Sequence, residues 1–209
     1  MCELPLSGLS RLRINSDGPG IRTLIGTYGC PLRCKYCINP QSWKPDSYVR
    51  CVTPRQLYDE VSVDNLYFQT TGGGLTVGGG EPLLHVDALE SFLNLCPATW
   101  SLWVETSLAV EREKVMKASR MFHYFFVDMK SLDPEIYHNY TGGKLEIAYE
   151  NLRVLLAAVG PDRITVRLPM IPGYSGKVQQ QNDREKLAKM GIVHFDLFTY
   201  QTAKKNREA

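Results

Sequence analysis

The chain has 209 residues, of which 44% are hydrophobic and 22% are charged, a composition typical of a folded globular protein with one sizeable core. Its formal net charge of +2 does not favour nucleic acid or a membrane surface as the main partner. The first fifteen residues lack the apolar run of a signal peptide, and no segment is long enough to span a membrane. We therefore expect one domain, residues 1–209, in the cytoplasm.

Short β-rich runs alternate with helix-like stretches along the chain. We expect strands at 21–27, 74–77, 102–105, 124–128, 164–168 and 195–198. Helices are expected from Thr53, with Pro54 in the first turn, and at 86–95, 111–118, 149–159 and 182–190. Such alternation predicts βαβ units around a parallel sheet. Periodicity alone leaves open whether that sheet is flat or part of a barrel, but the repeats are too few for a closed eight-fold barrel.

Polar residues follow several of the expected strands directly. They occupy 78–81, 105–107, 128–130 and 199–201. In parallel α/β folds the carboxyl ends of the strands meet at one edge of the sheet, and that edge carries the chemistry. The sequence therefore predicts a functional site where these segments converge.

Three cysteines lie close together just after the first expected strand. Cys30, Cys34 and Cys37 form a C-x3-C-x2-C pattern, which suits metal ligands in a reducing compartment. Three thiolates can hold three irons of a cubane cluster and leave the fourth iron open for a small molecule. A zinc site usually has four protein ligands, so zinc bound with help from Cys51 or a distant His is the alternative on spacing alone.

A glycine-rich turn ending in an acid follows the second expected strand. Gly79 and Gly80 would let a ligand approach the backbone, and Glu81 could pair with an ammonium group. Many tight turns share this composition. The turn therefore gains meaning only from the cysteine loop that precedes it.

With an aromatic residue, Tyr36, before the last cysteine, the loop resembles the signature of the radical S-adenosylmethionine (SAM) superfamily. The resemblance implies a [4Fe–4S] cluster on Cys30, Cys34 and Cys37 whose open iron binds the amino and carboxylate groups of SAM. It also implies reductive cleavage of SAM to a 5′-deoxyadenosyl radical that abstracts a hydrogen atom from the substrate. Tyr36 is then expected near the adenine, and the glycine–glutamate turn near the methionine amino group.

Segment 17–23, which reads Asp-Gly-Pro-Gly-Ile-Arg-Thr, narrows the resemblance. With segment 37–40 it is similar to the activating enzymes of glycyl-radical enzymes, of the pyruvate formate-lyase activating type. This implies a partial (β/α)6 TIM-like barrel with parallel strands, and hydrogen abstraction from a backbone glycine of a protein partner. A flavodoxin or ferredoxin would donate the electron. Asp17 is implied to contact the substrate peptide, although a turn-forming role also suits it.

Further segments match the same family in order, and in such enzymes they lie beside the cofactor. We assign Asp17 and Lys130 as candidate catalytic residues. The candidate cofactor-binding residues are Tyr36, Gly79, Gly80, Glu81, Thr106, Ser107, Asp128, Lys130, Arg167, Tyr200 and Gln201. The resemblance also implies a monovalent cation held by oxygens of Glu105, Thr106 and Asp128.

Some positions depart from the family pattern. Ile38 and Gln201 stand where histidines are usual, and Glu105 replaces an aspartate. These departures concern the partner more than the radical chemistry. Two other functions stay open: a radical SAM enzyme acting on a small molecule or short peptide, like 7-carboxy-7-deazaguanine synthase, and a non-catalytic iron–sulfur or zinc module.

Overall fold

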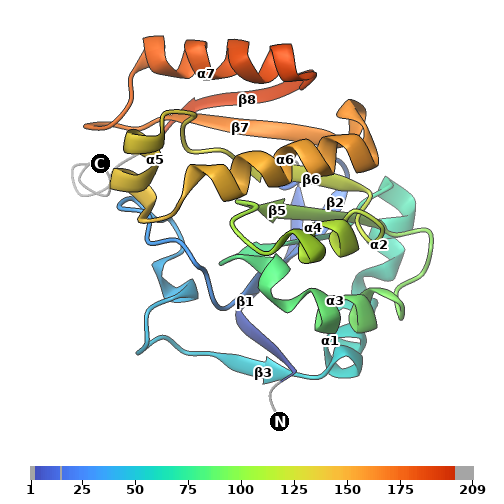
Figure 1. Ribbon diagram of the computed structural model, residues 1–209. Coiled ribbons are helices and arrows are strands. Elements are labelled where there is room, and N and C mark those ends of the chain that lie inside the picture. Colours follow the sequence, from blue (N-terminus) through green and yellow to red (C-terminus); the bar gives the residue numbers. More distant parts are fainter. Residues whose placement is uncertain (1–2, 15, 201–209) are drawn as a thin grey trace, which may run out of the picture.

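The computed structural model describes residues 3–14 and 16–200 (Figure 1). In this part of the chain eight strands form one sheet in the order β3-β1-β2-β4-β5-β6-β7-β8. The strands are β1 (Leu4–Ile14), β2 (Ile21–Thr27), β3 (Arg50–Val52), β4 (Gly74–Gly79), β5 (Ser101–Thr106), β6 (Tyr124–Asp128), β7 (Ile164–Met170) and β8 (His194–Thr199). Strands β2 and β4 to β8 run parallel.

These parallel strands are the ones predicted from the sequence, and the predicted α/β fold, a partial TIM-like barrel, is confirmed. The sheet is open, with β3 and β8 at its edges. Sequence reasoning missed β1 and β3, which add to the sheet by antiparallel pairing, as in the pair Leu4 and Val52. Leu4 and Leu6 are buried, so β1 adds core side chains beyond the parallel strands.

The helices are α1 (Pro54–Val61), α2 (Asn65–Thr71), α3 (Val86–Leu93), α4 (Arg112–Ala118), α5 (Pro134–Thr141), α6 (Leu145–Val159) and α7 (Lys177–Met190). Figure 1 shows α3, α4 and α6 in front of the strands. Helix α1 begins as expected, because Thr53 and Gln56 form a reciprocal capping box. The sequence did not predict α2 and α5. Within the described ranges, no helix combines the length and apolar character needed to cross a membrane.

The main core lies between these helices and one face of the sheet. Val104, Phe125, Val127 and Val166 point to that face and are fully buried. Side chains alternate along a strand, so their neighbours point the other way, onto what we call the inner face. There Trp103 stacks on Tyr124 with ring centroids 4.3 Å apart. The inner face and the carboxyl edge of the parallel strands frame the candidate site.

Candidate functional site

The cysteine loop, residues 30–37, follows β2 and is held against α5. The Arg33 N–H donates to the Thr141 carbonyl (2.7 Å), and the Lys35 N–H donates to the Tyr140 carbonyl (3.1 Å). In Figure 1 the loop runs on the left, below α5. Its cysteines are partly buried and form no disulfide. The fold therefore presents three thiols at the carboxyl edge of the sheet, as the sequence predicts.

These thiols need a positive partner to ionise. Burial raises the pKa of Cys30 to about 12 and also raises the pKa of Cys34, where the charge of Lys130 acts in the opposite direction. Bound metal would supply that positive charge. Among the described residues, no three His, Cys, Asp or Glu side chains converge closely enough for a single ion.

The glycine–glutamate turn packs against the carboxyl end of β2. The Gly80 N–H donates to the Thr27 carbonyl (3.0 Å), and the Glu81 N–H donates to the Gly29 carbonyl (2.7 Å). A Cβ at Gly80 would lie only 2.1 Å from the Gly29 carbonyl oxygen. Glycine is thus required for the turn to meet the start of the cysteine loop. Contact of Gly79 and Gly80 with a ligand stays a prediction.

The Glu81 carboxylate is fully buried and points to the end of β5. It accepts hydrogen bonds from Thr106 Oγ1 (2.7 Å), Ser107 N (2.8 Å) and Ser107 Oγ (2.6 Å). Burial raises the pKa of Glu81, although these donors oppose the shift. The carboxylate therefore ties two predicted site residues to the turn. The contact of Glu81 with the methionine amino group of SAM stays a prediction.

Asp128 and Glu105, the acids expected at two strand ends, meet through Arg167 of β7. Arg167 Nε lies 2.7 Å from Asp128 Oδ1, and Arg167 Nη1 lies 2.9 Å from Glu105 Oε1. Burial opposes the charges, but the attraction outweighs it: the pKa of Asp128 is lowered and the pKa of Arg167 is raised. A monovalent cation here would have to compete with the guanidinium, and Thr106 already faces Glu81. The predicted cation stays untested, and this arrangement does not favour it.

Lys130 follows β6 and is buried at the same edge. Its Nζ donates to Tyr200 Oη (2.9 Å) and lies 3.6 Å from Asp128 Oδ2. Burial disfavours the ammonium charge, but the attraction of Asp128 outweighs it and holds the pKa of Lys130 well above its usual value. A permanently charged lysine suits binding of an anionic group better than proton transfer. Gln201, the other predicted residue here, lies outside the described residues.

Asp17 lies apart from the cysteine loop. Its carboxylate is buried and bound by Arg13, and its carbonyl accepts a hydrogen bond from Thr76 Oγ1 (2.8 Å). Thr76 pairs with Trp103, two residues before Glu105 on β5. Asp17 is therefore nearer the amino ends of the strands than the acids at the carboxyl edge. Its contact with a substrate peptide stays a prediction.

Comparison with known proteins shows which family the chain belongs to. The model of the Radical SAM superfamily matches residues 24–179, a span that includes the cysteine loop, the glycine–glutamate turn and Arg167. The chain belongs to the radical SAM superfamily. The cofactors of this family are a [4Fe–4S] cluster and SAM, as the sequence predicts.

Relatives of this radical SAM enzyme agree with that assignment. The chain is 32% identical over 185 residues to the pyruvate formate-lyase-activating enzyme of Staphylococcus aureus strain USA300, covering 84% of this chain and 69% of the relative. The fold is similar to Streptococcus suis SuiB bound to S-adenosylmethionine (TM-score 0.65, 12% identity), covering 84% of this chain but 39% of SuiB. It is also similar to QueE from Escherichia coli (TM-score 0.57, 15% identity), with 98% and 86% covered.

The residues of this radical SAM enzyme fit its cofactors. Cys30, Cys34 and Cys37 would hold the cluster, because their thiols are free and lie on one loop. On α5, which contacts the cysteine loop, the buried Tyr137 hydroxyl has no hydrogen-bond partner among the described residues, as expected of a polar group whose partner belongs to a bound cofactor. Lys130 adds a positive charge that would attract an anionic group.

Four tyrosines gather at the rim of the site, and sequence reasoning found only two of them. Ring centroids lie 5.9 Å apart for Tyr36 and Tyr140, 6.1 Å for Tyr36 and Tyr174, and 6.0 Å for Tyr140 and Tyr200. They come from the cysteine loop, α5, the turn after β7 and the end of β8. The expected position of Tyr36 near the adenine stays a prediction. The signal for α5, an Asp133–Pro134 start and Gly142 after the end, is present in the sequence.

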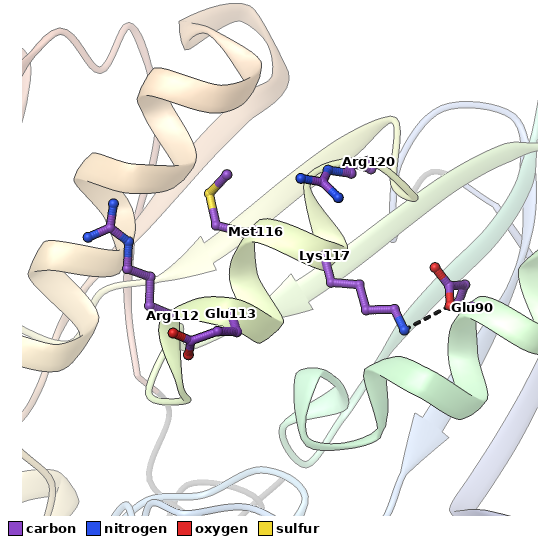
Figure 2. Close-up of a pocket in the computed structure, with 6 residues that line it drawn as sticks. All are labelled: Glu90, Arg112, Glu113, Met116, Lys117 and Arg120. Carbon is purple, nitrogen blue, oxygen red and sulfur yellow. Dashed lines mark ion pairs between the residues drawn. The ribbon is translucent and has the colours of Figure 1, made fainter.

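A pocket of about 340 Å³ lies elsewhere, among side chains of α3 and α4. Figure 2 shows the residues that line it, which are Glu90, Arg112, Glu113, Met116, Lys117 and Arg120. Lys117 Nζ and Glu90 Oε2 form an ion pair there at 2.8 Å. The pocket contains none of the predicted site residues, so it is not the site of the radical chemistry.

Proposed function

We propose that this radical SAM enzyme activates a glycyl-radical enzyme by removing a hydrogen atom from one backbone glycine of that partner. The observation that carries the proposal is the 32% sequence identity to a pyruvate formate-lyase-activating enzyme, over 84% of this chain. Segment 17–23 supports it. Its Asp17 and Gly18 lie on the inner face, where a Cβ on Gly18 would come within 2.9 Å of the Trp103 ring.

In this proposal the chain positions the cofactors and protects the reaction. When bound, the cluster on Cys30, Cys34 and Cys37 supplies the electron that cleaves SAM to a hydrogen-abstracting radical. Lys130 and the Arg167 network would hold anionic groups at the carboxyl edge, and the rim tyrosines would exclude water around the adenine. Asp17 would meet the substrate peptide as it enters along the inner face.

The cysteine loop has the surface expected for protein partners. Arg33 and Lys35 are exposed on it, which would favour an acidic electron donor such as a flavodoxin or ferredoxin. Ile38 is 76% exposed and Tyr48, farther along the same connection to β3, is 80% exposed. Large exposed apolar side chains beside a candidate active site are consistent with docking of a macromolecule.

The test is an anaerobic assay with a candidate glycyl-radical enzyme. The reconstituted chain, SAM and a reductant are mixed with the partner, and electron paramagnetic resonance is recorded. We expect a glycine-centred radical on the partner and release of 5′-deoxyadenosine. The matched controls are the Cys34→Ala chain and a partner whose radical glycine is replaced by alanine, both of which should give no such signal.

Three other outcomes of this assay would contradict the proposal. If SAM is cleaved but no plausible glycyl-radical partner acquires a radical, the activase proposal fails while the superfamily assignment stands. Appearance of a modified small molecule or short peptide in the same assay would then favour that alternative. A chain that binds iron but never cleaves SAM would favour a non-catalytic module.

A further inference from the structure

Tyr137 of α5 has a buried hydroxyl that the described structure leaves without a hydrogen bond. The side chain is 0% exposed, and its Oη has no donor or acceptor partner. A buried hydroxyl with no partner is destabilising, and buried polar groups in folded proteins are nearly always paired. The hydroxyl therefore points to a partner that is not a protein atom of the described chain.

The position of α5 is firmly set against the cysteine loop. Asp133 caps the helix by accepting from two backbone N–H groups, and Gly142 ends it with a positive φ of 71°. Its last carbonyls, on Tyr140 and Thr141, accept hydrogen bonds from the loop backbone. Tyr137 lies one helical turn before Thr141, so its ring is carried to the same contact.

The packing around Gly143 also places the Tyr137 ring close to the cysteine loop. A Cβ built on Gly143 would lie 2.5 Å from Leu32 Cδ2 and 3.4 Å from the Tyr137 ring carbon Cε1. Leu32 lies between two cluster cysteines, Cys30 and Cys34. One small glycine thus separates the tyrosine ring from the loop, which leaves the ring little freedom to turn away.

The charged neighbours of the hydroxyl belong to the site. After burial itself, the strongest influences on the pKa of Tyr137 come from Cys34, Lys130, Glu81 and Cys30. Burial raises that pKa, so the hydroxyl keeps its proton at neutral pH and remains a donor. Lys130 is itself a donor, and the Glu81 oxygens already accept from Thr106 and Ser107. The remaining candidate acceptors lie on the cysteine loop that α5 contacts.

We propose that Tyr137 donates a hydrogen bond from its hydroxyl to a sulfur atom of the [4Fe–4S] cluster held by Cys30, Cys34 and Cys37. Hydrogen bonds to cluster sulfurs help to set the reduction potential. A donor stabilises the reduced cluster more than the oxidised one, because the reduced cluster carries more negative charge. Tyr137 therefore raises the reduction potential of the cluster and makes its reduction by the electron donor easier. The inference rests on the superfamily and its cluster, not on the identity of the partner.

The test compares Tyr137→Phe with the native chain. The substitution keeps the ring and removes only the hydroxyl. Tyr58→Phe is the matched control, because Tyr58 stacks on Trp100 in a different part of the core. The chains are reconstituted anaerobically without SAM, and the midpoint potential of the cluster is measured by redox titration with electron paramagnetic resonance. We expect a potential more negative than native in Tyr137→Phe alone, with an unchanged iron content.

A second measurement covers the case in which Tyr137→Phe fails to retain its iron. Incorporation of 3,5-difluorotyrosine at position 137 keeps the hydroxyl but makes it a stronger donor, so the potential should shift to a more positive value. An unchanged potential in an iron-loaded Tyr137→Phe or difluorotyrosine chain overturns the proposal. Neither arm uses a glycyl-radical partner, so this inference and the activase proposal fail separately.

The metal-free chain gives an independent readout. Without a cluster the Tyr137 hydroxyl has no partner, so Tyr137→Phe should unfold at a higher temperature than the native metal-free chain. Tyr58→Phe should not show this gain. A lower unfolding temperature for metal-free Tyr137→Phe contradicts the proposal, because it means that the hydroxyl already has a partner in the protein.

Discussion

Two arginines on the inner face, Arg22 fully buried and Arg167 partly buried, are accommodated in opposite ways. Arg22, near the amino ends of the strands, donates only to neutral oxygens, and burial lowers its pKa to about 10. Arg167, near the carboxyl ends, is paired with Asp128 and Glu105, and their attraction outweighs burial and raises its pKa. Arg22 is therefore held by hydrogen bonds to neutral groups, whereas Arg167 is held by ion pairs with two acids at the carboxyl edge.

The hydrogen bonds of Arg22 reach two other strands, β4 and β5. It donates to Thr76 Oγ1 (2.8 Å), the Leu75 carbonyl (2.6 Å) and the Ser101 carbonyl (2.7 Å). Its guanidinium also lies over the Trp103 ring, 4.8 Å from the centroid. These contacts join β2 to β4, its neighbour, and to β5, the next strand in the sheet, so Arg22 acts as a cross-strand bridge and not as a ligand-binding group.

The largest expected effect is at the carboxyl edge. Cys34→Ala should abolish the cluster, because only two of three iron ligands remain. Metal analysis and visible absorption after anaerobic reconstitution measure this loss. Thermal unfolding of the metal-free chain should change little, since the Cys34 thiol is free and makes no side-chain hydrogen bond to the described residues. Retention of the native iron content would contradict the assigned ligand set.

Arg22→Met should have the largest effect on folding. It leaves the Leu75 and Ser101 carbonyls and the Thr76 hydroxyl without their donor, at about 1–3 kcal/mol for each buried group. We expect the free energy of unfolding to fall by roughly 3 kcal/mol or more, measured by urea denaturation. Iron bound per folded chain should stay native. Loss of iron without loss of stability would mean that the amino half takes part in cofactor binding.

Arg167→Gln should have a smaller, pH-dependent effect. Arg167 outweighs burial and holds the pKa of Asp128 low, so this stabilisation is complete above the unfolded pKa, about 3.9, and is lost as pH falls through the folded pKa. The native chain should be about 1–3 kcal/mol more stable than Arg167→Gln near pH 7, with the gap narrowing below about pH 4.

Arg22→Met is the matched control for that experiment. Its partners are neutral, so its stability gap from the native chain should not narrow with acid in the same way. Parallel urea titrations at neutral and acid pH measure both gaps. If the Arg167 gap were constant with pH, the ion pair with Asp128 would not be what stabilises this half.

Thr76→Val should have the smallest effect. Valine keeps the shape but removes the hydroxyl that accepts from Arg22 Nε and donates to the Asp17 carbonyl. We expect a loss of about 1–2 kcal/mol by urea denaturation and no change in iron content. A loss as large as that of Arg22→Met would show that the bridge depends on this one hydroxyl and not on the two carbonyls.

Much of the fold could be predicted because its signals are local. Apolar runs such as 124–128 and 164–168 bounded by turn residues indicate buried parallel strands, and the Thr53 cap marks the start of α1. Strands β1 and β3 were missed, because their pairing joins distant segments and β1 is buried only in its first half. Helix α5 was also not predicted, although Asp133 and Gly142 are residues typical of a helix start and a helix end.

The candidate site also combines features that could be predicted from the sequence with features that could not. The spacing of Cys30, Cys34 and Cys37 predicted metal ligands on one short loop. The choice of an iron–sulfur cluster over zinc came from the resemblance to the radical SAM superfamily. The partners of Glu81 and Asp128 were not predictable, since Ser107 and Arg167 come from other strands. The sequence placed Asp17 with the catalytic residues, but the fold puts it two residues deeper along the inner face than Glu105.

The sequence by itself therefore determined the cofactor chemistry, the parallel α/β architecture and the edge at which the site forms, because each depends on residues close together in the chain. Only the tertiary structure decided which charges neutralise one another and which polar groups are left without a partner. Those outcomes depend on strand register and on how α5 packs against the cysteine loop. The unpaired hydroxyl of Tyr137 is of this kind, since it becomes visible only when every neighbour is in place.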